Sequence, residues 1–571
     1  MLKNPVILTV VLAAGVLLFL PTLTDGFMLD DYYQLAHIEE HPRLPDVGPL
    51  SIYTFADDSP GRAGEIQGDV LPWWADENLK IDFFRPLACV FYHVDHGLWG
   101  RNPVGYHATN LLLWAGLLLA LVLFYRRLGG PAVVLVAGLF YAVDEAHIIN
   151  IQWVAARHGL LGVAFSLAAL LQYHRFRSGG GRGALAAALG FALLGLLSSE
   201  VAVGLASYVL AYELCVAEGP ARKRILAAAP VLGLVLGYLV FYWLSGHGAR
   251  ESAFYLSPLQ RPVDYLLQTV GVRIPYLMMG SLSTVPADLS LHPDLQNACW
   301  PLLLAWGLFA LFVLLLLPHL LRDRVSRFMF LGAFLSLLPQ ASAWPMNRLL
   351  ILPTVGFAWV LGSAVVDYFD RFRKKQARRW LLAAAAAVLF IVHGLVAPVQ
   401  SVIFTRGYSR WIDWMDSTSA VAEMPPQEES PRARVLLLSG PEHGIYFPVI
   451  RWAQGRSWPA AVWVISVALG DHRLTRTGPA SFFLEVGSPG LLNGVWELLL
   501  RKDRDMQVGR RFSRGALQVE IAGVTGGEIR KIAVTLDLPL DSPDVWLLGW
   551  TGEGWVRIPA PAAGESVEIG R

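Results

Sequence analysis

The sequence has few charged residues and few cysteines. Only 16% of its 571 residues are Asp, Glu, Lys or Arg, and the formal net charge is +1, so nothing points to nucleic-acid binding. Its three cysteines (Cys89, Cys215 and Cys299) have no CxxC spacing, which leaves a cysteine-based metal site or a disulfide framework without support. No internal repeat is visible.

Apolar residues are abundant instead. They make up 54% of the chain and form repeated uncharged runs, which is typical of a polytopic helical membrane protein. The first run follows Lys3 but lacks a small-residue cleavage site, so we expect an uncleaved first span. The runs predict about eleven membrane-spanning helices. The candidates are Pro5–Leu23, Tyr106–Tyr125, Ala132–Val143, Leu160–Tyr173, Ala184–Leu197, Val201–Val216, Ile225–Leu244, Pro301–Leu321, Phe328–Leu338, Leu349–Val366 and Trp380–Val396.

The stretch from Ala184 to Val216 is too long for one span. A single helix of this length would extend about 50 Å and would carry Glu200 at its centre, where a charge is most costly. Basic clusters precede and follow the stretch, and two short spans place both clusters on the same side of the membrane. We therefore expect a break at Ser198-Ser199-Glu200.

Five basic loops define the orientation by the positive-inside rule. They contain Arg126-Arg127, residues 175–182, 222–224 and 322–327, and the run from Arg371 to Arg379. With these loops in the cytoplasm, the N-terminus is cytoplasmic. The loops 24–105 and 245–299 and the C-terminal region then lie outside. We expect residues 1–399 to form a transmembrane domain, in a bacterial inner (cytoplasmic) membrane.

The composition changes after the last span. We expect a linker over 400–431 and a β-rich extracytoplasmic domain over 432–571, because short β-type runs there are separated by Gly and Pro turns. The runs are 434–438, 461–465, 517–521, 531–536 and 544–548. No nucleophile elbow, phosphate loop or metal motif occurs in this sequence region. An accessory role is expected, which leaves open capping the site, binding an acceptor or contacting a partner.

Unusual polar residues gather at the predicted outer ends of the helices. The adjacent carboxylates Asp30 and Asp31 follow the first span, where an acid costs about 3 kcal/mol or more unless it faces water, a cation or a substrate. An ordinary acidic loop start is the alternative. The remaining members of the set are Arg85, His93, Asp95, His96, His107, Asn110, Asp144, Glu145, His147, Asn150, Trp153, Arg157, Glu200, Asn347 and Arg348. Single polar helix ends often extend to the membrane interface, and for His93, His96, Trp153 and Trp344 this interpretation is favoured. The whole set on one side favours a site.

Ordered motifs in the first two thirds of the chain resemble those of the polytopic GT-C glycosyltransferases. The closest resemblance is to the O-mannosyltransferases that carry tetratricopeptide repeats and to their bacterial relatives. The motifs are GFMLDD (26–31), FRPL (84–87), LWGRNPVGYHATNLLL (98–113), the stretch 147–157, Ser199-Glu200 and NRLLILPTVGF (347–357). Three positions depart from the family pattern, since Asn347 replaces Glu, Ser199 replaces Lys and Gly159 replaces Asp. The repeats are also absent, which puts the acceptor and the donor sugar in doubt.

The resemblance implies an inverting transfer of a sugar from a polyprenyl-phosphate donor in the membrane to a protein, glycan or lipid acceptor outside the cytoplasm. Arg157, Arg348 and Arg273 would bind the donor phosphate. Asp30 or Asp31 would act as the base, or the pair would hold a divalent cation such as Mg²⁺ or Mn²⁺. The expected supporting residues around the substrates are Arg85, His107, Asn110, His147, Trp153, Glu200 and Asn347.

Two other functions stay open at this point. A lipid or sugar transporter would also place charges in the membrane, but it predicts two symmetric halves, which the sequence does not contain. The departures at Asn347 and Ser199 keep open a catalytically inactive relative that acts as an assembly or interaction protein.

Overall fold

The computed structural model describes residues 5–57, 71–292, 295, 298–426, 429–502 and 506–570. Parts of the predicted outer loops (58–70, 293–294 and 296–297) and of the predicted linker (427–428) lie outside the described residues. The chain divides into two compact units. The first comprises Met1–Asp25, Phe84–His247 and Ser257–Ser409, and the second comprises Gly26–Phe83, Gly248–Leu256 and Arg410–Arg571.

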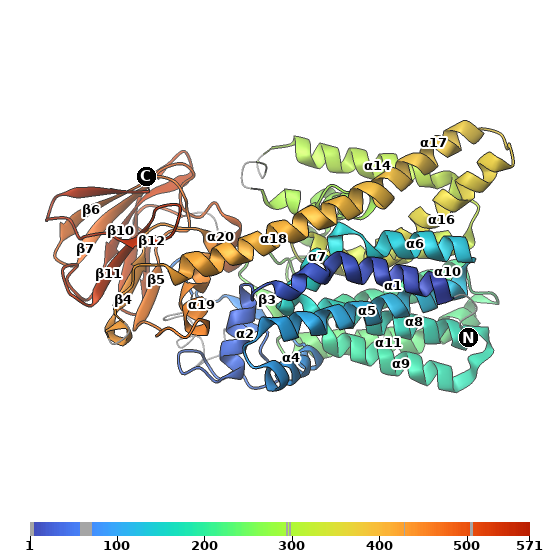
Figure 1. The fold of residues 1–571 in the computed structure, drawn as a ribbon, viewed down its shortest axis with the longest axis horizontal. Coiled ribbons are helices and arrows are strands. Elements are labelled where there is room, and N and C mark those ends of the chain that lie inside the picture. Colours follow the sequence, from blue (N-terminus) through green and yellow to red (C-terminus); the bar gives the residue numbers. More distant parts are fainter. Residues whose placement is uncertain are drawn as a thin grey trace. The chain divides into compact units, whose positions relative to one another are not determined.

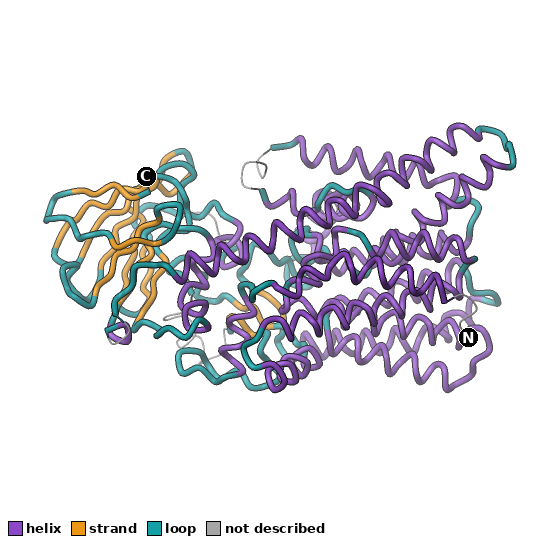
Figure 2. Tube along the Cα trace, in the orientation of Figure 1, coloured by secondary structure: helices purple, strands orange, loops and turns teal. Residues whose placement is uncertain are grey.

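The first unit is helical (Figures 1 and 2). Apolar side chains from most of its helices form one continuous core, and Figure 1 shows α1, α5, α8, α9 and α11 running alongside one another. The helices are α1 (Pro5–Phe19), α4 (Pro86–Trp99), α5 (Pro103–Leu128), α6 (Pro131–Ala142), α7 (Ile148–Gln152), α8 (Arg157–Arg175), α9 (Gly181–Ser198), α10 (Leu205–Cys215), α11 (Ala221–Leu244), α12 (Pro262–Gln268), α13 (Ile274–Leu282), α14 (Trp300–Leu320), α15 (Arg324–Gln340), α16 (Pro353–Arg373) and α17 (Arg379–Phe390).

Each of the eleven predicted spans overlaps one of these helices, but fewer stretches have the length and apolarity of a membrane crossing. Within the described part of the chain six do so, and a seventh is added if α6 and the segment Glu145–Gln152, bent by 49°, count as one span. The six are Pro5–Thr24, Pro103–Leu128, Val154–Ser198, Ala221–Leu244, Trp300–Leu320 and Arg379–Ala420. An integral membrane protein is thus supported, while the number eleven stays a prediction.

Helix boundaries follow local chemistry. Helix α5 begins where the Asn102 side chain accepts a hydrogen bond from the Val104 amide, and Pro103 needs no partner for a backbone N–H. The predicted break at Ser198-Ser199-Glu200 is confirmed. Helix α9 ends at Ser198, the Ser199 hydroxyl accepts from the Val201 amide, and a 3₁₀ turn starts at Glu200.

The second unit combines helix α2 (Asp30–Ile38) with the C-terminal sheets (Figure 2). It has a small antiparallel sheet in the order β1-β2-β3, a six-stranded antiparallel sheet in the order β13-β6-β7-β10-β9-β8, and a four-stranded mixed sheet in the order β12-β11-β4-β5. The strands are β1 (Thr54–Ala56), β2 (Lys80–Asp82), β3 (Gly248–Arg250), β4 (Arg434–Leu437), β5 (Ala461–Val464), β6 (His472–Gly478), β7 (Ser481–Val486), β8 (Arg511–Arg514), β9 (Leu517–Thr525), β10 (Glu528–Thr535), β11 (Val545–Trp550), β12 (Trp555–Arg557) and β13 (Ser566–Ile569). Two short helices, α19 (Phe447–Ala453) and α20 (Val495–Leu500), complete it.

All five predicted β-type runs are strands of this unit, namely β4, β5, β9, β10 and β11. The predicted linker at 400–431 is mostly not a linker, because helix α18 (Ala397–Ala420) continues through it. The predicted outer loops also contain regular structure, with α2, β1, β2 and α4 in the first and β3, α12 and α13 in the second. Residues 26–83 and 248–256 belong to the same compact unit as the C-terminal sheets.

Candidate functional site

The acid pair begins helix α2 in the second unit. Leu29 precedes it with a φ of 47°, a backbone conformation that is rare outside glycine, so the chain turns sharply before Asp30. Asp31 is fully buried, and its carboxylate accepts a hydrogen bond from the Met28 amide at 2.9 Å. Asp31 therefore stabilises the turn that starts the helix, where a negative charge is also favoured by the helix dipole.

Asp30 has a different environment. It is partly exposed, and its carboxylate accepts a hydrogen bond from the Tyr446 hydroxyl at 2.7 Å. The two adjacent side chains thus serve different contacts, as expected for neighbours that project about 100° apart on a helix. A divalent cation needs several oxygen ligands at one point. Asp31 is committed to Met28, and the described residues contain no group of three His, Cys, Asp or Glu with metal-site geometry. A cation at the pair therefore stays a prediction.

Arg157, a predicted phosphate ligand, is buried inside the first unit with a partner of its own. Its guanidinium lies 2.5 Å from the Asp95 carboxylate and also donates to the Tyr106 carbonyl. The Tyr92 ring lies 4.8 Å from the guanidinium carbon. With no exposed surface, Arg157 is placed to hold α4, α5 and α8 together, and the structure does not favour phosphate binding by this residue.

Arg273 is also committed to backbone groups. It is 2% exposed and donates to the carbonyls of Ala341 and Ser342, just after the end of α15. Carbonyls at a helix C-terminus lack partners within the helix, so Arg273 satisfies groups that would otherwise be costly to bury. Its guanidinium carbon is 5.6 Å from the Trp344 ring. This arrangement does not favour the predicted phosphate role either.

Arg348 differs from these two arginines. It is partly exposed, whereas they are buried. Its guanidinium carbon is 5.6 Å from the Trp153 ring, and its Nε, like those of Arg157 and Arg273, has no hydrogen-bond partner among the described residues. Its backbone is held by Asn150, which donates to the Arg348 carbonyl at 3.0 Å. Arg348 is therefore fixed in place while its guanidinium keeps binding capacity.

The neighbouring Asn347 organises the loop beside Arg348. Its side-chain oxygen accepts from the Ala287 amide, and its own amide donates to the Asp288 carboxylate, each at 2.8 Å. Burial raises the pKa of the Asp288 carboxyl, whereas the Asn347 amide and the positive charge of Arg348 oppose this rise. The predicted supporting role of Asn347 is thus structural in this conformation.

A second arginine lies near Arg348 in the first unit. Arg85 contacts Glu200 at 2.9 Å, and the Tyr242 hydroxyl donates to the same carboxylate at 3.2 Å. His158 is hydrogen-bonded to Ser199 at 2.8 Å, and both Arg85 and Arg348 lie close enough to its ring to act on it electrostatically. We call Arg85, His158 and Arg348 the polar cluster.

The other predicted supporting residues are inside the helical core. His147 has no exposed surface, and its ring packs against the rings of Trp114 and Tyr141, 5.3 and 4.3 Å away. Asn110 is buried and donates to the Ile151 carbonyl, and His107 is equally buried. These three residues fill the interior between helices.

Sequence reasoning missed His158, Tyr242, Asp288 and Tyr446. His158 directly follows Arg157, and consecutive residues on a helix face different directions. A helix predicted at this position could therefore have identified His158 as a candidate. Burial of Arg157 in the core leaves its neighbour on another face. The distant residues carry no comparable local signal.

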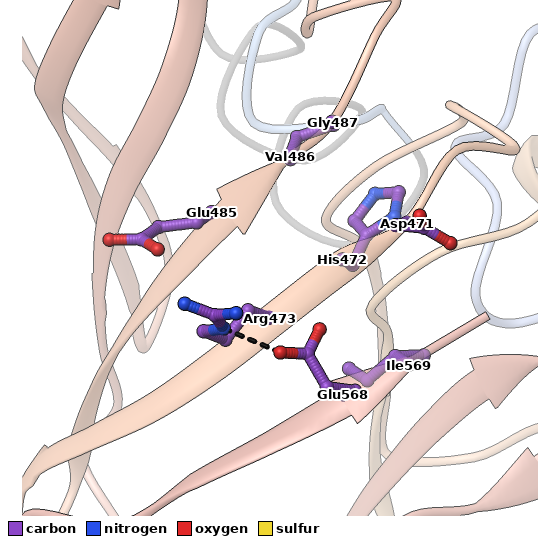
Figure 3. A pocket seen from close by; sticks show the side chains of 8 residues that line it. All are labelled: Asp471, His472, Arg473, Glu485, Val486, Gly487, Glu568 and Ile569. Carbon is purple, nitrogen blue, oxygen red and sulfur yellow. Dashed lines mark hydrogen bonds and ion pairs between the residues drawn. The ribbon is translucent and has the colours of Figure 1, made fainter. Parts of the chain in front are cut away.

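The second unit has an open hollow of about 460 Å³ that contains none of the predicted site residues (Figure 3). It lies on strands β6, β7 and β13, where Arg473 pairs with Glu568 at 2.6 Å. The His472 ring on its floor is hydrogen-bonded to Ser466 and to the Gly470 carbonyl, so this histidine is part of the fold. The lining residues are Asp471, His472, Arg473, Glu485, Val486, Gly487, Glu568 and Ile569.

Comparison with known proteins confirms the resemblance inferred from the motifs. Over 125 residues the chain is 31% identical to the protein O-mannosyl-transferase Tmtc1 of Drosophila melanogaster, which covers 21% of this chain. The chain matches only 14% of that relative's length. No protein-family model matches the chain.

Several solved structures are similar to part of the chain. An Archaeoglobus fulgidus oligosaccharyltransferase tethered to an acceptor peptide aligns with a TM-score of 0.44 and 13% identity, over 82% of this chain and 65% of that one. The same organism's AglB in complex with an inhibitory peptide and a dolichol-phosphate gives 0.41 and 12%, over 81% and 65%. ArnT from Cupriavidus metallidurans bound to undecaprenyl phosphate gives 0.34 and 11%, over 80% and 89%. This chain thus spans less than two thirds of the oligosaccharyltransferase chains.

Proposed function

We propose that the protein is an integral membrane glycosyltransferase that transfers a sugar from a polyprenyl-phosphate donor to an acceptor hydroxyl. The polar cluster is the observation that carries this proposal. In this cluster His158 lies within electrostatic reach of two guanidinium groups, those of Arg85 and Arg348, near the ends of apolar helices. Sequence identity to an O-mannosyl-transferase over 125 residues supports the same reaction class.

The cluster suits the leaving group of this reaction. Departure of a lipid phosphate leaves negative charge on its oxygens, which arginine neutralises through short, charge-assisted hydrogen bonds. Arg348 is the partly exposed one of the three predicted phosphate ligands, and its guanidinium lies against the Trp153 ring, so it is the residue that we assign to the phosphate. Arg85 forms an ion pair with Glu200. We assign Arg85 to orienting the sugar phosphate.

Asp30 is the residue that we assign as the base. The acceptor oxygen bonds to the anomeric carbon as its proton passes to the Asp30 carboxylate. The bond from that carbon to the phosphate oxygen breaks, and its electron pair stays on the phosphate. One displacement of this kind inverts the anomeric centre, and it requires a single carboxylate. Asp31, which is buried under the turn, supports the helix that carries Asp30.

The test is sugar transfer by purified full-length protein in nanodiscs, with a panel of polyprenyl-phosphate sugars and with peptide, glycan and lipid acceptors. Arg348→Lys keeps the charge but loses the planar guanidinium, so we expect the donor KM to rise at least about tenfold. Arg379→Lys is the matched control, because Arg379 is also partly exposed and lies 5.6 Å from a tryptophan ring, that of Trp380. Absence of transfer with every donor, or equal effects of the two variants, would contradict the proposal.

We also propose that the C-terminal region lies outside the cytoplasm, as the five basic loops indicate. Alkaline phosphatase fused after Arg571 should be active, because the enzyme matures only outside the cytoplasm. An active cytoplasmic reporter at the same position would reverse the assignment.

A further inference from the structure

The proposed base and a tyrosine of the C-terminal region form a pair within the second unit. The Tyr446 hydroxyl donates a hydrogen bond of 2.7 Å to Asp30, although the two residues are 416 positions apart in sequence. Tyr446 belongs to a short 3₁₀ turn, Glu442–Tyr446, which leads directly into helix α19. Helices α2 and α19 pack against each other, so the contact is part of a wider interface.

Tyr446 is held rigidly by its surroundings. Its side chain is 7% exposed, and its ring centre is 5.4 Å from that of Tyr33 and 5.9 Å from that of Trp496. Trp496 in turn donates a hydrogen bond to Glu442, in the same turn as Tyr446. The aromatic contacts therefore fix the direction in which the phenol hydroxyl points.

The neighbouring residues of α2 fix the other half of the pair. The Tyr32 hydroxyl donates to Asp416 of helix α18, and the Tyr33 hydroxyl reaches the Ile445 carbonyl at 3.4 Å. Asp31 closes the turn before the helix. These three contacts fix the orientation of helix α2, which carries Asp30. Asp30 is the partly exposed member of the acid pair.

From this geometry we propose that Tyr446 is a positioning residue for Asp30. This inference rests on the proposed function. A hydroxyl donor 2.7 Å from the carboxylate fixes its rotamer and favours its ionised form, which is the form that accepts a proton. The C-terminal region would then contribute directly to the reaction through its contact with Asp30.

The first experiment is Tyr446→Phe in the full-length protein. The variant keeps the ring contacts with Tyr33 and Trp496 and loses only the hydroxyl. Because the hydroxyl orients the proposed base, we expect kcat to fall about 10- to 100-fold with the donor KM unchanged. The lost hydrogen bond should lower the melting temperature only slightly. The control is Tyr255→Phe, a tyrosine of the same unit whose ring packs on Phe83 and Phe254, and it should retain wild-type turnover.

A double-mutant cycle separates positioning from a merely structural role. If Tyr446 acts through Asp30, Tyr446→Phe should lower the residual turnover of Asp30→Asn by less than twofold. Equal losses in the two backgrounds, or a wild-type kcat for Tyr446→Phe, would overturn the inference. Failure of the proposed function gives a different result, because the wild-type protein itself would then transfer no sugar.

Discussion

The Arg157 guanidinium lies 2.5 Å from the Asp95 carboxylate, and the two side chains are 0% and 3% exposed. In the helical core, each side chain therefore supplies the main counter-charge for the other. Sequence reasoning assigned Arg157 to a donor phosphate, because it stands in a motif that resembles glycosyltransferases. The structure gives its charge a protein partner, and this changes what a substitution there should do.

Removing one member of this pair should destabilise the protein. Asp95→Ala would leave a buried guanidinium without its counter-charge, which typically costs about 3–5 kcal/mol. We expect a markedly lower melting temperature and poor recovery from the membrane. Glu520→Ala is the control, since its partner Arg511 is 80% exposed and surface pairs contribute about 0–1 kcal/mol. A stable Asp95→Ala variant with a selectively raised donor KM would restore the phosphate assignment.

Local patterns in the sequence were sufficient for several features of the fold. The five β-type runs and the helix break at Ser199 were predicted correctly, because strand propensity, turn residues and the cost of a buried Glu200 act within short segments. The pairings of Arg157 with Asp95 and of Asp30 with Tyr446 could not be predicted. They join residues 62 and 416 positions apart, and only the packing of distant elements decides them.

The difference between buried and exposed arginines has the same origin. A sequence motif marks Arg157, Arg273 and Arg348 alike as cations near helix ends. Only the structure reveals that Arg273 is 2% exposed and donates to two carbonyls that follow α15, whereas Arg348 is partly exposed. A charged side chain at a helix end can bind either the terminal carbonyls of the helix or a ligand, and the residue type alone does not distinguish these two roles.

The two acids should respond differently to amide substitution. Asp30→Asn removes the proposed base while keeping the side-chain size, so we expect turnover to fall about 100-fold or more with little change in melting temperature. Asp31→Asn places an amide NH₂ in a fully buried position, which should cost about 1–3 kcal/mol of stability and less turnover. Steady-state kinetics and thermal unfolding of both purified variants provide the measurement. Equal and wild-type transfer rates in both variants would remove the acid pair from the mechanism.

Gly356 should not tolerate even one methyl group. A Cβ at this position of α16 would lie 2.2 Å from the Met329 carbonyl oxygen of α15, and a backbone atom cannot move aside as a flexible side chain can. We expect Gly356→Ala to lower the free energy of unfolding by about 1–3 kcal/mol through overpacking. Gly190→Ala in α9 is the matched control. It meets no atom within 4 Å, so it should be neutral or slightly stabilising. Similar melting temperatures for the two variants would show that α15 and α16 can separate at little cost.

His443 should make the stability of the second unit depend on pH. The residue is 2% exposed among the rings of Trp414 and Trp555, and burial lowers its pKa from 6.5 to about 3. The unfolded chain therefore binds a proton first as the pH falls. The free energy of unfolding should decrease by about 1.4 kcal/mol per pH unit, starting below 6.5 and levelling off near 3.

His443→Phe tests this dependence, because phenylalanine keeps a ring in the aromatic cluster and cannot be protonated. The variant loses the contact between His443 and the Thr418 hydroxyl and should be somewhat less stable at pH 7.5. Its melting temperature, followed by tryptophan fluorescence from pH 7.5 to 4.5, should fall less steeply than that of the wild type. Parallel curves for the two proteins would mean that another group controls the acid sensitivity and that His443 is already accessible to protons in the folded state.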